Sequence, residues 1–302
     1  MSSGLDLRAA AAAAFTGFQV GAGIVATRFV IDQTTPASLA MMRYIVGFCC
    51  LVPPLLMAPR VRFARGDLVP IALLGITQFG ILVALLNFGL QYIPSARAAL
   101  IFATFPLLTM VLGALLGRER LSPAKTAGVT LTVLGVGLTL GERVMGGGGG
   151  ERSDAWIGEL AVFASALSGA VCSVLYRPYL KKYPTLPVSA FAMLASVGFL
   201  AILAAAEGFF DQVPDFTPGG WGAILFIGAS SGIGYYLWLW ALAHASPTRV
   251  TVFLALSPVT AAGLGALLLG EAPTVGMLAG LAAVALGLWL AHWTRPAEGG
   301  AR

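Results

Sequence analysis

Long apolar runs, broken by charges, prolines or glycine clusters, follow one another along the whole chain. A helix that crosses the roughly 30 Å hydrocarbon core of a bilayer needs about 20 apolar residues, because each residue adds about 1.5 Å. Ten runs approach or reach that length and predict ten membrane-spanning helices, at residues 9–30, 37–57, 68–91, 96–116, 125–141, 156–176, 188–206, 219–243, 248–269 and 274–293. The predicted fold class is therefore an all-α integral membrane protein.

One connection between these runs is atypical. The stretch GERVMGGGGGERSD, residues 141–154, contains five consecutive glycines, and no Gly-Lys-Ser/Thr follows as a phosphate-binding loop would require. Such a glycine run predicts a flexible linker. It divides the chain into residues 1–141, with five spans, a linker at 142–155, and residues 156–302, with five more and a short tail.

Composition and charge fit this organisation. Only 10% of the 302 residues are charged and the mean hydropathy is +0.88, whereas soluble domains carry about 25% charged residues. If the N-terminus is cytoplasmic, 13 of the 18 Lys and Arg residues lie on the cytoplasmic side. The five on the outer side are Arg28, Arg43, Arg97, Arg143 and Arg152. This bias follows the positive-inside rule and predicts that both termini are cytoplasmic. The net charge of +5 then reflects membrane topology and needs no nucleic-acid partner.

The two halves share a sequence repeat. At an offset of 152 residues, the region around 96–128 matches the region around 248–280 without a gap. The paired residues are Arg97 and Arg249, Pro106 and Pro258, Gly113 and Gly265, and Glu119 and Glu271. The matching spans are the fourth and the ninth, so an odd number of crossings separates them and the copies are predicted to run in opposite directions. Inverted repeats of this kind surround a central site in many transporters and allow alternating access.

These features resemble the EamA-type branch of the drug/metabolite transporter superfamily. The resemblance rests on the repeated five spans and on the Pro-(x)₆-Gly-(x)₅-Glu pattern of residues 106–119 and 258–271, and it extends over residues 8–141 and 156–293. Within the superfamily, the chain is most similar to bacterial exporters of aromatic and other apolar amino acids. The resemblance implies a ten-helix bundle around a central cavity, in a bacterial inner membrane, that functions as a monomer.

Pro106 and Pro258 occupy equivalent places in the two halves. Each removes a backbone donor, which lipid tolerates only where neighbouring helices or a wet cavity satisfy the freed carbonyls. The pair predicts symmetric gates, and simple packing kinks are the alternative. For Glu119 and Glu271, at helix ends, capping or a loop salt bridge is the predicted role.

Polar and aromatic residues deep in the spans are the candidate substrate contacts, because such positions usually face a cavity. The predicted contacts are Gln19, Gln78, Phe79, Phe102, Ser168, Ser231, Tyr235 and Trp238. A hydrogen bond between helices is the alternative for each polar residue. For Trp238, a lipid-facing aromatic belt at the membrane surface is the alternative.

The positions of the charged residues limit the class of substrate that the chain is expected to carry. No Asp, Glu, Lys or Arg lies near the middle of a predicted span, and the nearest, Arg43 and Glu159, are placed within reach of the outer surface. A cavity of amides, hydroxyls and aromatics suits a zwitterionic amino acid such as Phe, Tyr, Trp, Leu or Met. Without an evident proton carrier, we expect facilitated export driven by the substrate gradient.

Other classes of protein fit less well. An enzyme would need a cluster of catalytic or metal-binding side chains, but His244 and His292 stand alone and no metal-ligand spacing is present. We therefore expect no catalytic residues, cofactor or metal. The predicted partners are the lipid bilayer and a small molecule. The second hypothesis is a broad-specificity exporter of neutral drugs or metabolites.

Overall fold

The computed structural model describes residues 7–117, 127–128, 130–131, 134–135, 154–212, 214–245, 247–271 and 274–292. Within these residues the regular structure is entirely helical. Seven helical segments there are long and apolar enough to cross a membrane, and two shorter apolar helices, Leu256–Leu269 and Val275–Gly287, accompany them. This length and composition are those of a multi-pass membrane protein.

Helices occupy the first four predicted spans. In chain order they are α1 (Leu7–Val30), the 3-10 turn η1 (Ile31–Gln33), α2 (Pro36–Met57), α3 (Arg65–Gly75), the π-helical η2 (Ile76–Ile81), α4 (Leu82–Leu90), α5 (Ser95–Phe102) and α6 (Phe105–Leu115). The backbone stays helical through η2, so α3, η2 and α4 form one continuous segment.

The described residues of the second half are also largely helical. Its elements are α8 (Ala155–Leu175), α9 (Arg177–Lys182), α10 (Thr185–Ala206), α11 (Pro218–His244), α12 (Pro247–Thr251), the 3-10 turn η3 (Val252–Ala255), α13 (Leu256–Leu264), the π-helical η4 (Gly265–Leu269) and α14 (Val275–His292).

Nine of the ten predicted spans coincide with helices in the part of the chain that the structure describes. The fifth, 125–141, and nearly all of the predicted linker lie outside the described residues, apart from a few positions. Glu119 lies outside them as well. The count of ten therefore stays a prediction.

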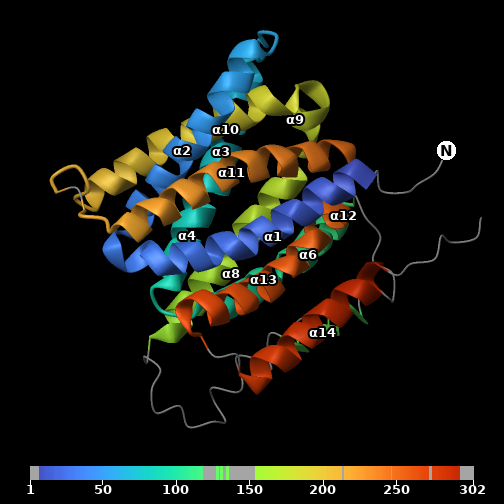
Figure 1. Ribbon diagram of the computed structural model, residues 1–302. Helices are drawn as coiled ribbons and strands as arrows, with labels where there is room; N and C mark the ends of the chain where they lie inside the picture. The colour runs from blue at the N-terminus through green and yellow to red at the C-terminus, as the bar shows by residue number, and fades with distance from the viewer. Residues whose placement is uncertain are drawn as a thin grey trace, which may run out of the picture.

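The two halves interlock. Helix α1 lies between α11 and α13 (Figure 1), and α2 packs against α10 and α11. In the other direction, α8 packs against α4 and α6, and α10 against α3. Each of these contacts joins residues from the two sides of the predicted linker, so the core is shared by both halves.

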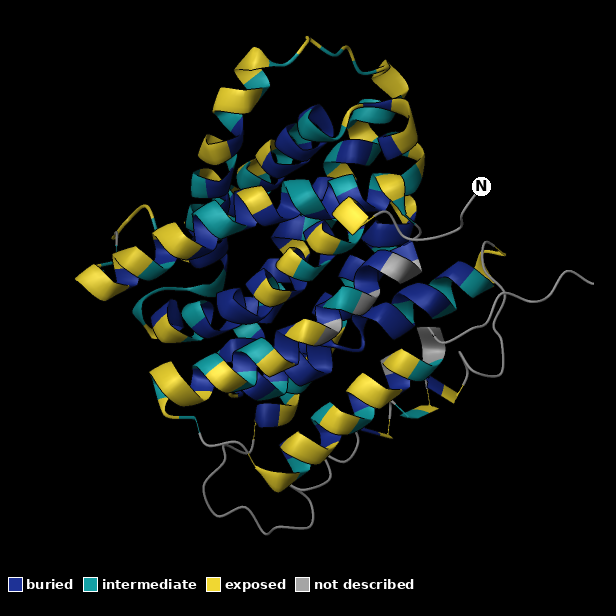
Figure 2. Cartoon of the chain, turned by 45° about the vertical axis from the view of Figure 1, so that its right-hand side comes forward, coloured by how far each residue is buried: buried dark blue, intermediate teal, exposed yellow. Residues whose placement is uncertain are grey.

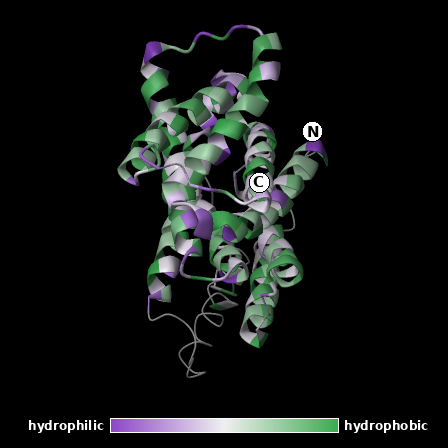
Figure 3. Cartoon of the chain, turned by 60° about the vertical axis from the view of Figure 1, so that its left-hand side comes forward, coloured by the Kyte–Doolittle hydropathy of each residue, from purple (hydrophilic) through white to green (hydrophobic). Residues whose placement is uncertain are grey.

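The outward faces of the helices are apolar. Leu115, Ile202 and Leu267 are 77%, 70% and 81% exposed. Figure 2 shows exposed residues along the outer faces of the helices, and Figure 3 shows apolar colouring along their lengths. A continuous apolar surface of this kind is a liability in water but suits helices that face lipid.

Glycines bring neighbouring helices into backbone contact. A Cβ added to Gly232 of α11 would lie 2.5 Å from the carbonyl oxygen of Gly47 on α2. A Cβ on Gly17 of α1 would lie 2.0 Å from the Phe253 carbonyl oxygen. No side chain fits in either space, so small residues set the helix spacing here, as is common in membrane bundles.

A carboxylate from the end of α10 caps the start of α2. The N-cap residue Thr35 makes no capping bond of its own to the helix backbone. Instead, Glu207 accepts hydrogen bonds from the backbone N–H groups of Ala37 and Ser38 at 3.1 and 3.0 Å. A negative charge at a helix N-terminus satisfies unpaired donors and complements the helix dipole.

A second carboxylate acts in the same way on α5. Glu271 accepts from the backbone N–H of Ser95 at 3.2 Å and from the Ser95 hydroxyl. The predicted capping role of Glu271 is confirmed, but the capped helix lies 176 residues earlier in the chain. The N-termini of two helices in the first half, α2 and α5, are therefore capped by carboxylates from the second half.

We predict that Glu207→Ala lowers the free energy of unfolding by about 1 kcal/mol, because the first turn of α2 loses its acceptor. The measurement is the melting temperature of the purified protein in detergent. Asp211→Ala removes an exposed acid from the same loop and serves as the matched control. An equal shift in both variants would show that the cap does not stabilise α2.

Candidate functional site

A cavity lies inside the bundle, between α1, α2, the η2–α4 segment, α5, α6, α11 and η3. Its volume is about 90 Å³. Residues from both sides of the predicted linker line it, so neither half encloses it alone.

Seven of the eight predicted substrate contacts line this cavity. They are Gln19 on α1, Gln78 and Phe79 on η2, Phe102 on α5, and Ser231, Tyr235 and Trp238 on α11. Trp238 is only 3% exposed, so the alternative of a lipid-facing belt is wrong for this residue. That these residues bind a substrate stays a prediction.

Ser168 is the residue that the structure does not bring to the cavity. Its hydroxyl donates to the Ala164 carbonyl oxygen of its own helix at 2.9 Å. The buried face of α8 carries Ser165, Ala166, Gly169 and Ala170, whereas Ser168 is only partly buried. Because successive residues of a helix are turned by about 100°, depth along the span did not determine which way Ser168 faces.

Pro106 follows a break in the fourth span. The turn at Ala103 and Thr104 separates α5 from α6, and the Thr104 hydroxyl donates to the Ile101 carbonyl oxygen at 2.8 Å. Pro106 then occupies the first turn of α6, where a missing backbone N–H costs little.

Pro258 has a similar setting in the second half. It lies in α13, directly after the 3-10 turn η3. Neither Pro106 nor Pro258 is among the residues that line the cavity. Gating by the two prolines stays a prediction.

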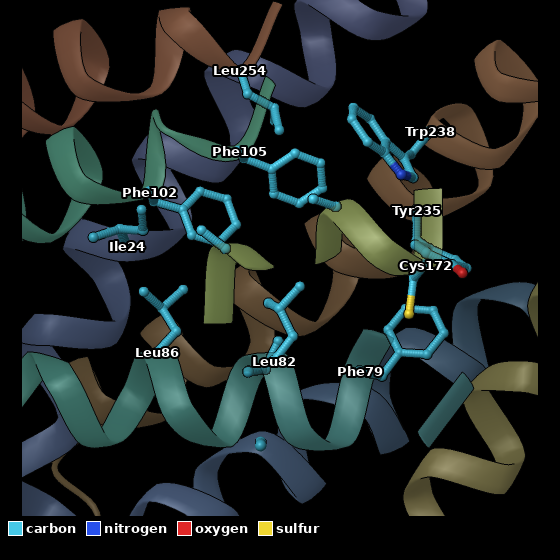
Figure 4. Packing of buried hydrophobic residues seen from close by; sticks show 14 of the residues in the cluster. Ile24, Phe79, Leu82, Leu86, Phe102, Phe105, Cys172, Tyr235, Trp238 and Leu254 are labelled. Atoms are coloured by element: carbon cyan, nitrogen blue, oxygen red, sulfur yellow. The ribbon is translucent and has the colours of Figure 1, made fainter. Parts of the chain in front are cut away.

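Aromatic rings form much of the cavity wall. The ring of Phe79 lies 3.9 Å from that of Tyr235 and 4.8 Å from that of Tyr44, measured between centroids. The ring of Phe105 lies 5.5 Å from that of Phe102 and 5.9 Å from that of Trp238. Figure 4 shows Phe102 and Phe105, on either side of the break, turned towards the same interior as Trp238. This wall suits a planar or apolar body.

Arg43 also lines the cavity, although it was not among the residues predicted from the sequence to contact the substrate. Only 8% of the residue is exposed, so it faces the interior of the bundle. Its depth in the membrane, within reach of the outer surface, stays a prediction. Nε of Arg43 donates to the hydroxyl oxygen of Ser231 at 2.6 Å, and that hydroxyl in turn donates to the Ile227 carbonyl oxygen. Arg43 is the one charged residue among those lining the cavity, all of which the structure describes.

A signal for this position was present in the sequence. Gly47 lies four residues after Arg43, on the same face of α2, and α11 comes into backbone contact with α2 at Gly47. Arg43 therefore points towards α11 rather than towards lipid. Distance from the end of the span gave only its depth in the membrane.

Comparisons with known proteins place the chain among transporters. The model of the EamA-like transporter family matches residues 7–141 and 156–293. A probable terminal-alkyne amino-acid exporter of Streptantibioticus cattleyicolor is 30% identical over 272 residues, which cover 86% of each chain. A probable amino-acid metabolite efflux pump of Salmonella typhimurium is 27% identical, over 79% of this chain and 85% of the relative.

An uncharacterized transporter of Archaeoglobus fulgidus is 26% identical, over 89% of this chain and 93% of the relative. A solved crystal structure superimposes with a TM-score of 0.71 at 24% identity, over 92% of this chain and 97% of that chain. At that identity the superposition supports the fold alone. The family and the names of the relatives indicate a transporter rather than an enzyme.

We predict that Ser231→Ala lowers the free energy of unfolding by about 1–3 kcal/mol, because it leaves a buried charged donor unpaired. Ser168→Ala is the matched control and should change it by less than about 0.5 kcal/mol, since it faces away from the cavity. Thermal unfolding of the two purified variants is the measurement. A larger loss in Ser168→Ala would contradict the placement of the two serines.

Proposed function

The chain belongs to the EamA-like transporter family, and from this premise we propose that it exports neutral apolar and aromatic amino acids and related small metabolites. The observation that carries the proposal is a buried guanidinium, Arg43, in a cavity walled largely by aromatic rings. An amino acid has the matching parts, a carboxylate and an apolar body. Two of the relatives named above are described as amino-acid or amino-acid-metabolite exporters, which supports the same cargo.

The alternative of a broad-specificity exporter of neutral drugs has less support. A buried cation is costly unless an opposite charge or good hydrogen-bond acceptors compensate it. A neutral drug supplies no charge to Arg43. A phosphate ester would supply about two negative charges to a single guanidinium, in a cavity that is otherwise uncharged.

Transport proceeds by alternating access of two inverted five-helix halves, ten spans in all. The packing supports this arrangement, because contacts recur with the halves exchanged. Helix α1 packs on α11 and α13, and α8, which begins the second half as α1 begins the first, packs on α4 and α6.

Aromatic side chains must move when a substrate binds. Pockets that enclose small ligands measure about 300–1,000 Å³, several times the volume of this cavity. The rings of Phe79, Phe102 and Tyr235 occupy space that an amino-acid side chain would need. Their displacement accompanies opening of the cavity to one side of the membrane.

The protein acts as a monomer in the bacterial inner membrane, with both termini in the cytoplasm. The distribution of Lys and Arg supports this orientation, and a cavity built from one chain supports the monomer. No Asp, Glu or His lines the cavity, all of whose lining residues are described, so the substrate gradient drives export.

The experiment that tests this proposal is uptake of radiolabelled phenylalanine, leucine, lysine and glutamate into liposomes that contain the purified protein. We expect saturable flux of phenylalanine and leucine only, because the side-chain charge of lysine or glutamate would lie among the aromatic rings, away from Arg43, where no lining residue carries an opposite charge. An imposed pH gradient should leave the flux unchanged. Empty liposomes are the control, and flux no higher than theirs would reject amino acids as cargo and favour the neutral-drug alternative.

A further inference from the structure

We infer that Arg43 binds the carboxylate of the cargo and that the cavity selects apolar monocarboxylates, whether or not they carry an ammonium group. Amino acids are then one subset of a wider substrate class, and amines without a carboxylate are excluded. The inference rests on the proposed transport through this cavity and adds the head group that the cavity recognises.

The first support is the lack of a charge partner for Arg43. None of the described carboxylates forms an ion pair with it, and its one hydrogen bond joins Nε to the neutral hydroxyl of Ser231. The two terminal nitrogens are therefore left to bind another acceptor. Guanidinium groups present parallel donors that match the two oxygens of a carboxylate.

The second support is a convergence of donors beside Gly23 of α1. A Cβ added to Gly23 would lie 3.7 Å from Nη2 of Arg43 and 3.6 Å from Nε2 of Gln19. Gln19 Nε2 uses one proton in its bond to the Ser230 hydroxyl at 3.2 Å and keeps the other. A cationic donor and an amide donor thus both lie within 4 Å of one point beside a backbone position without a side chain, which is a suitable place for an anion.

The cavity has no comparable site for a positively charged ammonium group. No Asp or Glu lines the cavity, and the buried lining oxygens without a hydrogen-bond partner, Oε1 of Gln78 and the hydroxyl of Tyr235, are both neutral. An ammonium group gains only neutral acceptors there and is repelled by Arg43. A carboxylate at Arg43 meets a full positive charge at short range, and the low dielectric of the cavity strengthens that attraction.

The expected affinity of each head group follows from the net charge that remains in the cavity after it binds beside Arg43. With a monocarboxylate bound, Arg43 is neutralised. With a zwitterionic amino acid, one positive charge remains, and with an amine the cavity holds two positive charges. Because uncompensated charge in an apolar bundle is costly, the expected order of affinity is carboxylate, then amino acid, then amine by a wide margin.

Three compounds with the same phenylethyl body separate these cases: phenylalanine, 3-phenylpropionate and 2-phenylethylamine. Each is added unlabelled to compete with exchange of radiolabelled phenylalanine in proteoliposomes. We expect 3-phenylpropionate to inhibit at a concentration similar to that of phenylalanine or lower. The half-inhibitory concentration of 2-phenylethylamine should be higher by about tenfold or more, since like charges repel in the cavity.

Arg43→Gln tests the assignment directly. It should raise the half-inhibitory concentrations of the two carboxylates by about 10- to 100-fold, as expected for the loss of a charged hydrogen bond. It should also lower that of 2-phenylethylamine, an effect that mere loosening of the helices would not produce. Arg28→Gln is the control: Arg28 lies on α1 outside the cavity and pairs with Asp32 of η1. It should leave the half-inhibitory concentrations of all three compounds unchanged.

Gly23→Ala provides a second variant in case Arg43→Gln does not fold. The added methyl group meets its neighbours at ordinary contact distances, so the bundle should tolerate it. It lies between the two donors and should weaken inhibition by the carboxylates more than inhibition by the amine. Equal inhibition by amine and carboxylate in the wild-type protein, or an unchanged order in both variants, would overturn the inference.

The melting temperature of the purified protein distinguishes this inference from the proposed function. A ligand that binds the folded state raises the melting temperature, and at a given concentration a tighter ligand raises it more. If phenylalanine is not transported, but 3-phenylpropionate stabilises the wild-type protein and not Arg43→Gln, amino-acid export is rejected and the carboxylate site stands. If phenylalanine is transported and 3-phenylpropionate neither competes nor stabilises, the export proposal stands and this inference fails.

Discussion

The hydrogen bond from Arg43 to Ser231 holds a full positive charge inside a bundle whose outer surface is apolar. That bond is possible only because α2 and α11 touch through glycine, at Gly47 and Gly232, one turn further along α2. With a larger residue at either glycine, the guanidinium would lie farther from its acceptor. The spacing of two helices and the character of the cavity therefore have a common origin.

The cavity is lined by polar donors and by aromatic rings, and both halves of the chain contribute to each. Donors come from α1, α2, η2 and α11, and rings come from α2, η2, α5, α6 and α11. The capping carboxylates Glu207 and Glu271 join the same two halves at the ends of α2 and α5. A cavity of this kind exists only when the halves are assembled, so folding of the second half completes the site that the first half begins.

Much of this organisation could be predicted from the sequence. Runs of apolar residues locate the helices because length and hydropathy suffice to define a span. Polar residues deep in those runs located Gln19, Gln78 and Ser231 at the cavity. Depth says nothing about rotation, however, so Ser168 was placed at the cavity although it bonds within its own helix.

The same limit applies to Arg43, because its distance from the end of the span predicted its depth in the membrane but not that the side chain faces α11 and the cavity. The cap on α2 could not be predicted either. Glu207 bonds to residues about 170 positions earlier, and no local pattern encodes such a contact. Capping by Glu271 could be foreseen from its place at a helix end, but its partner, Ser95, depends on how the halves pack.

The break at Ala103 and Thr104 has a mechanical consequence. Helix α6 extends for 11 residues beyond it, a rigid rod of about 16 Å. If the joint turned by about 10°, the far end of this rod would sweep through about 3 Å, whereas side chains next to the joint would shift far less. Phe102 and Phe105 flank the joint and belong to the cavity wall. A large displacement of the far end of α6 would thus be accompanied by only a small shift of the two rings that contact the cargo.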